Sequence, residues 1–146
     1  MKIQNNNFYS QVILQLTVLI SCFFMVSCAN EQIVKAQDGL TISHIEVKTI
    51  GATDKSRPNM AKICKGFIIS RSQVQTFFQY SSHARNINSY KNYNILPCFS
   101  SGTALIDNKP FNWIIRSGGV GEFYNQHRHF LKICGKNCCD KVSGVC

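Results

Sequence analysis

Apolar and polar positions alternate through residues 40–50, and the parity of the apolar positions changes partway. Ile42 shares its parity with His44, whereas Ile45 and Val47 have the other parity. A two-residue repeat rich in β-branched side chains is typical of a strand, and one extra residue in that repeat moves later side chains to the opposite face. The pattern therefore predicts a strand over 40–50 with a bulge near His44.

The following segment changes from strand-like to helical periodicity. An apolar run over 60–70 predicts a second strand, after a turn-rich loop at 51–59. Ser70 followed three positions later by Gln73 has the form of a capping box, which satisfies free N–H groups at the start of a helix. We therefore expect a helix over 71–82, followed by a polar loop over 85–94. Apolar residues recur at helical spacing in this predicted helix, at Val74, Phe77 and Phe78.

Turn-forming residues divide the C-terminal half into short strands, and antiparallel strands joined by short turns form a meander. The predicted fold class is therefore α+β, an antiparallel sheet of about five strands with one helix packed on a face. The sequence predicts a strand ending at Ile106, a turn at 107–110, a partner strand at 111–117, a glycine turn at 118–121 and one or two further strands up to 134.

The parity of the strand over 111–117 separates expected core residues from expected surface residues. Trp113 shares its parity with Phe111 and Ile115, so we expect these three side chains in the core beneath the helix. Arg116 has the opposite parity and is expected at the surface, as a solvated charge or as an anchor for a partner.

The N-terminal residues have the pattern of an export signal. The apolar segment over 12–26 is shorter than the about 20 residues of a membrane-spanning helix, and no basic cluster follows it. Met25–Cys28, "MVSC", resembles the lipobox of bacterial lipoproteins. This resemblance implies removal of residues 1–27, acylation of Cys28 and, with Ala29 next in the chain, transport to the outer membrane. One alternative is cleavage before Asn30, which would give a secreted or periplasmic soluble protein, and another is an uncleaved N-terminal anchor.

Three regions follow from this processing. Residues 1–27 are interpreted as a lipoprotein signal peptide, residues 28–38 as the lipidated cysteine with a polar tether, and residues 39–146 as a single disulfide-rich α+β domain. Acyl chains such as palmitate on Cys28 would hold the domain on the membrane, because each buried methylene contributes about 0.8 kcal/mol.

Export also decides how the cysteines are interpreted. Of eight cysteines, Cys22 leaves with the signal and Cys28 is lipidated or removed, so an even number remains for disulfides in an oxidising compartment. Adjacent cysteines rarely bond to each other, so Cys138 and Cys139 are expected to have different partners. Cys64 and Cys98 are the candidate long-range partners of the terminal cysteines, and such disulfides would tie the C-terminus to both positions. Cys146 is a candidate for a disulfide that closes a local loop. The six expected disulfide cysteines are Cys64, Cys98, Cys134, Cys138, Cys139 and Cys146.

The mature chain is strongly basic. Removal of residues 1–27 takes away Lys2 and leaves fifteen lysines and arginines against seven aspartates and glutamates. This excess favours an anionic partner, either an acidic protein or an anionic lipid or lipopolysaccharide. The basic residues are scattered and form no aromatic-interleaved motif, so we expect no nucleic-acid partner. Arg116 and Arg128 are the candidate partner-binding residues.

Histidines, cysteines and a carboxylate that could bind a metal or act in catalysis lie near the C-terminus, but their spacing matches no known catalytic pattern. His127 and His129 lie two positions apart, close to the terminal cysteines, and form an alternative metal site with Glu122 as the best-placed carboxylate. Their spacing matches no strong zinc template, and exported thiols are expected to form disulfides. We therefore expect no cofactor and no catalytic residues, and we interpret the glycines over 118–121 as turn residues.

Three sequence features resemble a group of small bacterial exported proteins and lipoproteins that have no assigned activity. These features are "LPC" at 96–98, the Trp-x-Ile-x-x-Gly-Gly segment at 113–119 and the cysteine-rich end. The similarity extends over about 63–139 and implies one compact domain.

The leading hypothesis is a noncatalytic envelope lipoprotein that binds a protein, for example an immunity or inhibitor protein against an envelope-targeting effector. One alternative is a structural outer-membrane lipoprotein that binds anionic lipid or lipopolysaccharide. The other is a small metal-dependent hydrolase that uses His127 and His129.

Overall fold

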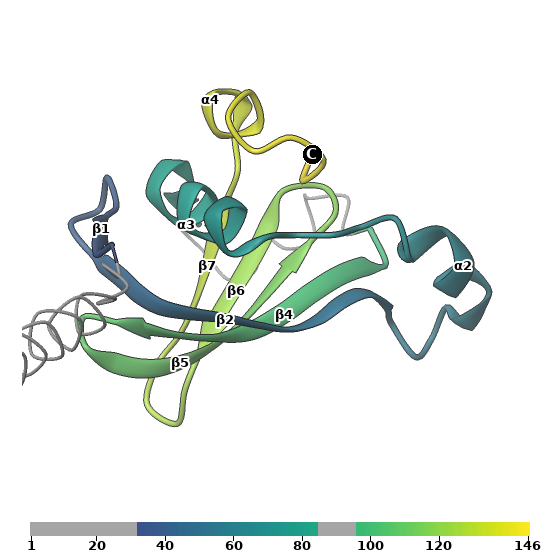
Figure 1. Ribbon diagram of the computed structural model, residues 1–146, viewed down its shortest axis with the longest axis horizontal. Helices are drawn as coiled ribbons and strands as arrows, with labels where there is room; N and C mark the ends of the chain where they lie inside the picture. Colours follow the sequence, from purple (N-terminus) through teal and green to yellow (C-terminus); the bar gives the residue numbers. More distant parts are fainter. Residues whose placement is uncertain (1–31, 85–95) are drawn as a thin grey trace, which may run out of the picture. The chain divides into compact units, whose positions relative to one another are not determined.

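The computed structural model describes residues 32–84 and 96–146, in which seven strands form one antiparallel sheet (Figure 1). The order across the sheet is β1-β2-β4-β5-β6-β7-β3, so β1 and β3 are its edges. The α+β prediction is confirmed, whereas the strand number differs from the expected five or so. The strands are β1 (Val34–Lys35), β2 (Thr41–Thr53), β3 (Ser82–His83), β4 (Cys98–Ile106), β5 (Lys109–Arg116), β6 (Val120–Tyr124) and β7 (His129–Ile133).

β2 contains the predicted bulge. Its register with β4 shifts between Ser43 and Glu46, and His44 lies between them with a φ of 49°. The shift brings the Glu46 carbonyl over Gly102 of β4, where a Cβ atom would lie 1.8 Å from that oxygen. Only glycine leaves room for this approach, which explains why a glycine stands in the middle of a buried strand.

The predicted meander is also confirmed. β4 to β7 follow one another as antiparallel neighbours, and buried residues alternate with half-buried ones throughout β4. The turn between β4 and β5 consists of Asp107 and Asn108, whose φ angles of 48° and 60° suit a two-residue hairpin. Trp113, Phe111 and Ile115 are all buried, as their shared parity predicts.

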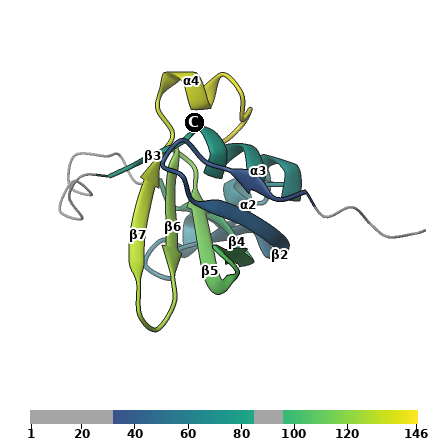
Figure 2. The ribbon, with the colours of Figure 1, turned by 90° about the vertical axis from the view of Figure 1, so that its left-hand side faces the viewer.

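α3 (Arg71–Tyr80) covers one face of the curled sheet (Figures 1 and 2). The capping box is present, since Ser70 Oγ accepts from the Gln73 N–H and the Gln73 side chain accepts from the Ser70 N–H. The buried face of the helix packs into the sheet, where the Phe78 ring meets the Phe123 ring edge-on at 5.1 Å. No helix in the described residues is long and apolar enough to cross a membrane.

The strand predicted over 60–70 is wrong. The 3-10 helix η1 (Pro58–Met60) and the short helix α2 (Ala61–Cys64) occupy its first half, and an extended connection to α3 occupies the rest. Burial follows helical spacing from Cys64 to Phe67 and strand spacing from Phe67 to Ile69. The apolar run therefore has two local conformations. The polar loop predicted over 85–94 lies outside the described residues.

Part of the segment expected to be a tether belongs to the folded domain. Residues 32–146 form one compact unit, in which β1 pairs with β2 and Ala36 is buried. The turn between β1 and β2 carries Asp38, which accepts a hydrogen bond from Lys132 of β7, and His83 Nε2 of β3 lies 3.0 Å from the same carboxylate. Asp38 thus joins one edge of the sheet to the other.

Lys132 is the buried member of this cluster. Its side chain is inaccessible to solvent, and its ammonium lies 4.6 Å from the centre of the Phe78 ring. Burial lowers the pKa of Lys132 below its ordinary value, against the opposing hydrogen bond and charge of Asp38. Burial also lowers the pKa of His83, followed in importance by the charge of Lys132. Asp38 is therefore the group that compensates a buried charge between the two edges of the sheet.

Candidate protein-binding surface

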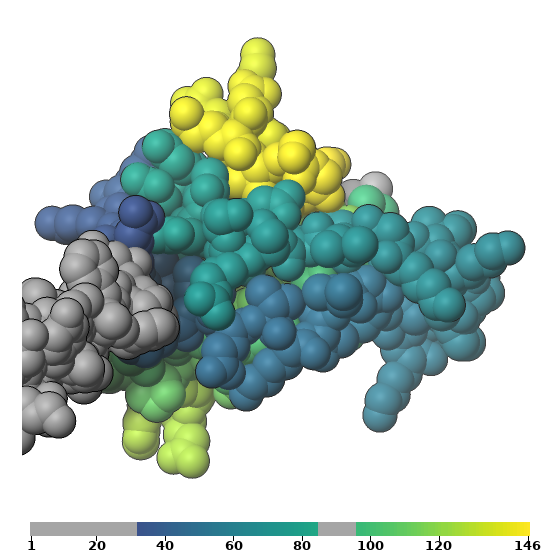
Figure 3. Space-filling model, in the orientation of Figure 1, coloured from purple at the N-terminus to yellow at the C-terminus, as the bar shows by residue number. Residues whose placement is uncertain are grey.

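Three isoleucines are largely exposed around α2. Ile50 is 55% exposed, Ile63 is 67% exposed and Ile68 is 61% exposed. They come from β2, from α2 and from the connection to α3, which the backbone hydrogen bond from Gly51 N–H to the Phe67 carbonyl holds together. We call these three side chains, with the basic residues around them in 48–68, the α2 surface. Figure 3 shows the end of the domain that carries it, at the right.

The segments that carry the α2 surface are rich in positive charge. Residues 48–68 contain five basic residues and one acidic residue, Asp54. Asp54 is already bonded to Arg116, so it does not offset the field of the surrounding cations. Exposed apolar side chains among exposed cations suit a partner that offers apolar and acidic side chains. The five basic residues, all exposed, are Lys48, Lys55, Arg57, Lys62 and Lys65.

Close backbone packing holds α2 against β2. Gly51 has a φ of 59°, and a Cβ atom there would lie 2.7 Å from the Cys64 carbonyl oxygen and 2.9 Å from the Lys65 Cα. A side chain at Gly51 would therefore push α2 away from the strand. The buried hydroxyl of Ser100 adds a second attachment, because it donates to the Phe67 carbonyl at 3.1 Å.

Arg116 anchors the chain between β2 and α2 through Asp54. It donates to both carboxylate oxygens of Asp54, at 3.0 and 3.2 Å, and to Glu122 at 3.2 Å. Its guanidinium lies 5.3 Å from the centre of the Phe99 ring. Burial opposes its charge, but the bonds and charges of the two carboxylates prevail and raise the pKa of Arg116. Its side chain is only 14% exposed, which corrects the expectation of a surface residue.

The disulfides divide into one long-range bond and two local ones. Cys64 pairs with Cys98, which fixes the end of α2 to the first residue of β4. Cys138 and Cys139 have different partners, as expected: Cys134 for the first and Cys146 for the second. The expected tie between the C-terminus and Cys64 or Cys98 is wrong, because the terminal cysteines pair among themselves around α4 (Lys136–Cys139).

The residues of the alternative metal site are spread over one hairpin. His129 Nε2 lies 3.7 Å from Glu122, whose other oxygen is bonded to Arg116. His127 is exposed in the turn before β7 and lines a separate pocket. Arg128, also exposed, lies over the Phe130 ring at 5.7 Å. These side chains do not converge on one point.

Potential metal-ligand geometry occurs at one group within residues 32–84 and 96–146. This group is Cys134, Cys139 and Cys146, whose sulfur atoms lie within 4.8 Å of one another. All three sulfur atoms belong to disulfides, so none is the thiolate that a metal ion binds.

Sequence reasoning missed the α2 surface because it assigned Ile63 and Ile68 to a strand. The signal that was present is the local charge, since residues 48–68 carry five of the chain's basic residues and a single acid. Ile33, at 67% exposure, shows that an exposed isoleucine alone is no guide. Comparison of the chain with known protein families, curated protein sequences and solved structures finds no match.

Proposed function

We propose that this protein is a noncatalytic binding module of the bacterial cell envelope, anchored by a lipid on Cys28, and that its α2 surface binds an acidic protein. In its finer form, the proposal is an immunity or inhibitor protein directed against an envelope-targeting effector. The observation that carries it is the exposure of Ile50, Ile63 and Ile68 together with five exposed cations in the same segments.

When a partner covers exposed apolar side chains and removes them from water, the free energy of the complex falls. Binding energy at protein interfaces is concentrated in a few central side chains that a surrounding rim shields from solvent. The cations of the α2 surface would speed association with an acidic partner and discriminate against basic ones.

The rigidity of α2 supports the same proposal. Gly51, the Cys64–Cys98 disulfide and the Arg116–Asp54 pair each fix this short helix or the residues beside it. A surface that is already ordered loses less conformational entropy when a partner binds. The fold therefore presents the isoleucines in a fixed arrangement.

The place of the α2 surface on the sheet also suits a partner. Cys98, beside α2, and Ile106 are the two ends of β4, and its nine residues span about 27 Å. Ile106 pairs with Ile42 near the start of β2, next to β1, where the folded unit begins. The α2 surface is thus remote from the point at which the N-terminal segment joins the domain.

The noncatalytic part of the proposal rests on how the carboxylates are used. Asp38, Asp54 and Glu122 are engaged in ion pairs with Lys132 and Arg116. A general base needs a carboxylate or imidazole positioned toward a substrate site, and these groups are positioned toward structural cations instead.

Replacing Ile63 by glutamate tests this function. We expect I63E to weaken binding to the partner about 30-fold, because it introduces a charge at the centre of the contact. The immobilised full chain captures proteins from envelope extracts, mass spectrometry identifies a stoichiometric protein, and the purified pair gives the affinity. K62E should mainly slow association and flatten its salt dependence.

Ile33→Glu is the matched control, since Ile33 and Ile63 have the same 67% exposure. I33E should leave the affinity unchanged. Equal losses in I33E and I63E would contradict the assignment of the α2 surface. Binding of the chain to anionic vesicles, with no stoichiometric protein captured, would instead support the lipid-binding alternative.

A further inference from the structure

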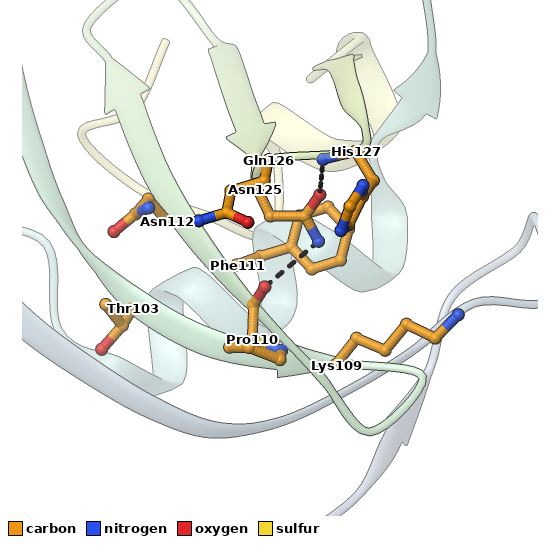
Figure 4. A pocket seen from close by; sticks show the side chains of 8 residues that line it. All are labelled: Thr103, Lys109, Pro110, Phe111, Asn112, Asn125, Gln126 and His127. Atoms are coloured by element: carbon orange, nitrogen blue, oxygen red, sulfur yellow. Dashed lines mark hydrogen bonds between the residues drawn. The ribbon is translucent and has the colours of Figure 1, made fainter.

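A pocket of about 490 Å³ lies between the ends of two hairpins (Figure 4) and has no lining residue in common with the α2 surface. One wall comes from the start of β5, with Lys109, Pro110 and Asn112, and the other from the turn between β6 and β7. Its volume is within the range of about 300–1,000 Å³ that is typical of small-ligand sites. We call it the hairpin pocket. Its lining residues are Thr103, Lys109, Pro110, Phe111, Asn112, Asn125, Gln126 and His127.

The side chain of Asn125 connects the two walls of the pocket by hydrogen bonds. Its side-chain oxygen accepts from the N–H groups of His127, at 2.9 Å, and Arg128, at 2.8 Å, which fixes the turn. Its side-chain nitrogen donates to the Pro110 carbonyl at 3.2 Å and so joins the two hairpins (Figure 4). The walls are therefore held in place by bonds within the protein, and the pocket is formed before any ligand arrives.

Four polar side chains of the lining, unlike that of Asn125, take no part in holding the walls of the pocket together. Within the described residues, the side chains of Lys109, Asn112, Gln126 and His127 make no hydrogen bond or ion pair. Together they offer an ammonium, two carboxamides and an imidazole, which are donors and acceptors along the lining of one pocket. No acidic side chain lines the pocket. The donor set therefore favours a ligand that has both hydroxyl groups and negative charge.

We propose that the hairpin pocket binds a sugar acid, a saccharide ring that carries a carboxylate. Lys109 pairs with the carboxylate, and His127 donates to it from the opposite wall. Asn112 and Gln126 bond the ring hydroxyls, which need partners that both donate and accept. The exposed ring of Pro110 packs against the C–H face of the sugar. This proposal uses other residues than the α2 surface and does not depend on it.

Titration of the full chain in detergent micelles with glucuronic acid tests the proposal, followed by NMR shifts of the His127 and Gln126 signals. Glucose has the ring without the carboxylate, and acetate has the carboxylate without the ring. We expect both to bind at least about tenfold more weakly than glucuronic acid, since each loses one set of bonds. K109Q should reduce glucuronic acid binding about tenfold and leave glucose binding unchanged.

Lys136→Gln is the control, because Lys136 is also exposed but lies on α4. K136Q should bind glucuronic acid as the unchanged chain does. Acetate binding as tightly as glucuronic acid would show a plain carboxylate site and overturn the assignment of a sugar. Failure of glucuronic acid to shift the pocket signals would overturn the site itself, and so would equal losses in K109Q and K136Q.

Discussion

Replacing Asp38 by alanine should lower the free energy of unfolding by about 3 kcal/mol, because it leaves the buried ammonium of Lys132 without a carboxylate. Lys132 is fully buried, and Asp38 accepts its hydrogen bond. The same carboxylate also contacts His83, so the substitution removes the link between β1–β2 and β7–β3. Urea unfolding followed by the emission of the single tryptophan, Trp113, measures the change.

A second substitution distinguishes the effect of losing the Asp38–Lys132 ion pair from the effect of disturbing the turn between β1 and β2. Lys132→Met in the Asp38→Ala chain removes the uncompensated charge and should restore about 2 kcal/mol. Asp140→Ala, at an exposed aspartate after α4, is the control and should change stability by less than about 0.5 kcal/mol. If D38A and D140A have the same small effect, Asp38 does not hold the edges of the sheet together.

Removing the Cys64–Cys98 disulfide by paired serine substitutions should cost about 4 kcal/mol in the chain-entropy model. The bond closes a loop with a sequence separation of 34, so it restricts the unfolded chain strongly. It also fixes the end of α2, and we therefore expect partner binding to weaken even at temperatures where the domain stays folded. Unfolding curves and the affinity for the partner, measured on the same sample, report both effects.

The Cys134–Cys138 disulfide is the matched comparison. Its sequence separation is only 4, and the same model gives about 2 kcal/mol for its removal. Partner binding should be unchanged without it, since it lies at α4. If removal of either disulfide weakens partner binding equally, the account of a surface held by Cys64 is contradicted.

Much of the fold could be predicted from the sequence because its signals are local. The capping box of Ser70 and Gln73 marks the start of α3, and alternating burial produces the meander from β4 to β7. The bulge at His44 is visible as a change of parity. β1 and β3 could not be found in this way, since each has two residues and so contains no period.

The strand prediction for residues 60–70, part of the candidate site, was wrong for a physical reason. An apolar run over 60–70 fits a buried strand, but Ile63 and Ile68 point to solvent while Cys64 and Ile69 are buried. The observed arrangement places Gly51 in close contact with the end of α2, a long-range feature that periodicity does not contain. The exposed isoleucines are therefore visible only in the folded chain.

The burial of two cations could not be predicted for a related reason. Arg116 and Lys132 belong to residue types that are mostly exposed, and the parity of Arg116 assigned it to the surface. In the structure their partners come from distant segments: Asp54 lies 62 positions from Arg116, and Asp38 lies 94 positions from Lys132. Pairing over such separations follows from the topology of the sheet, which strand patterns alone do not specify.

Hydrogen exchange of the protein with and without its captured partner tests the central claim most directly. The account predicts slower exchange of backbone amides in residues 48–68 of the complex, with no change around α4 or in the turn between β6 and β7. The full-length chain serves as its own reference, so the comparison needs no substitution. Protection confined to α4 or to the hairpin pocket, with residues 48–68 unchanged, would contradict the account.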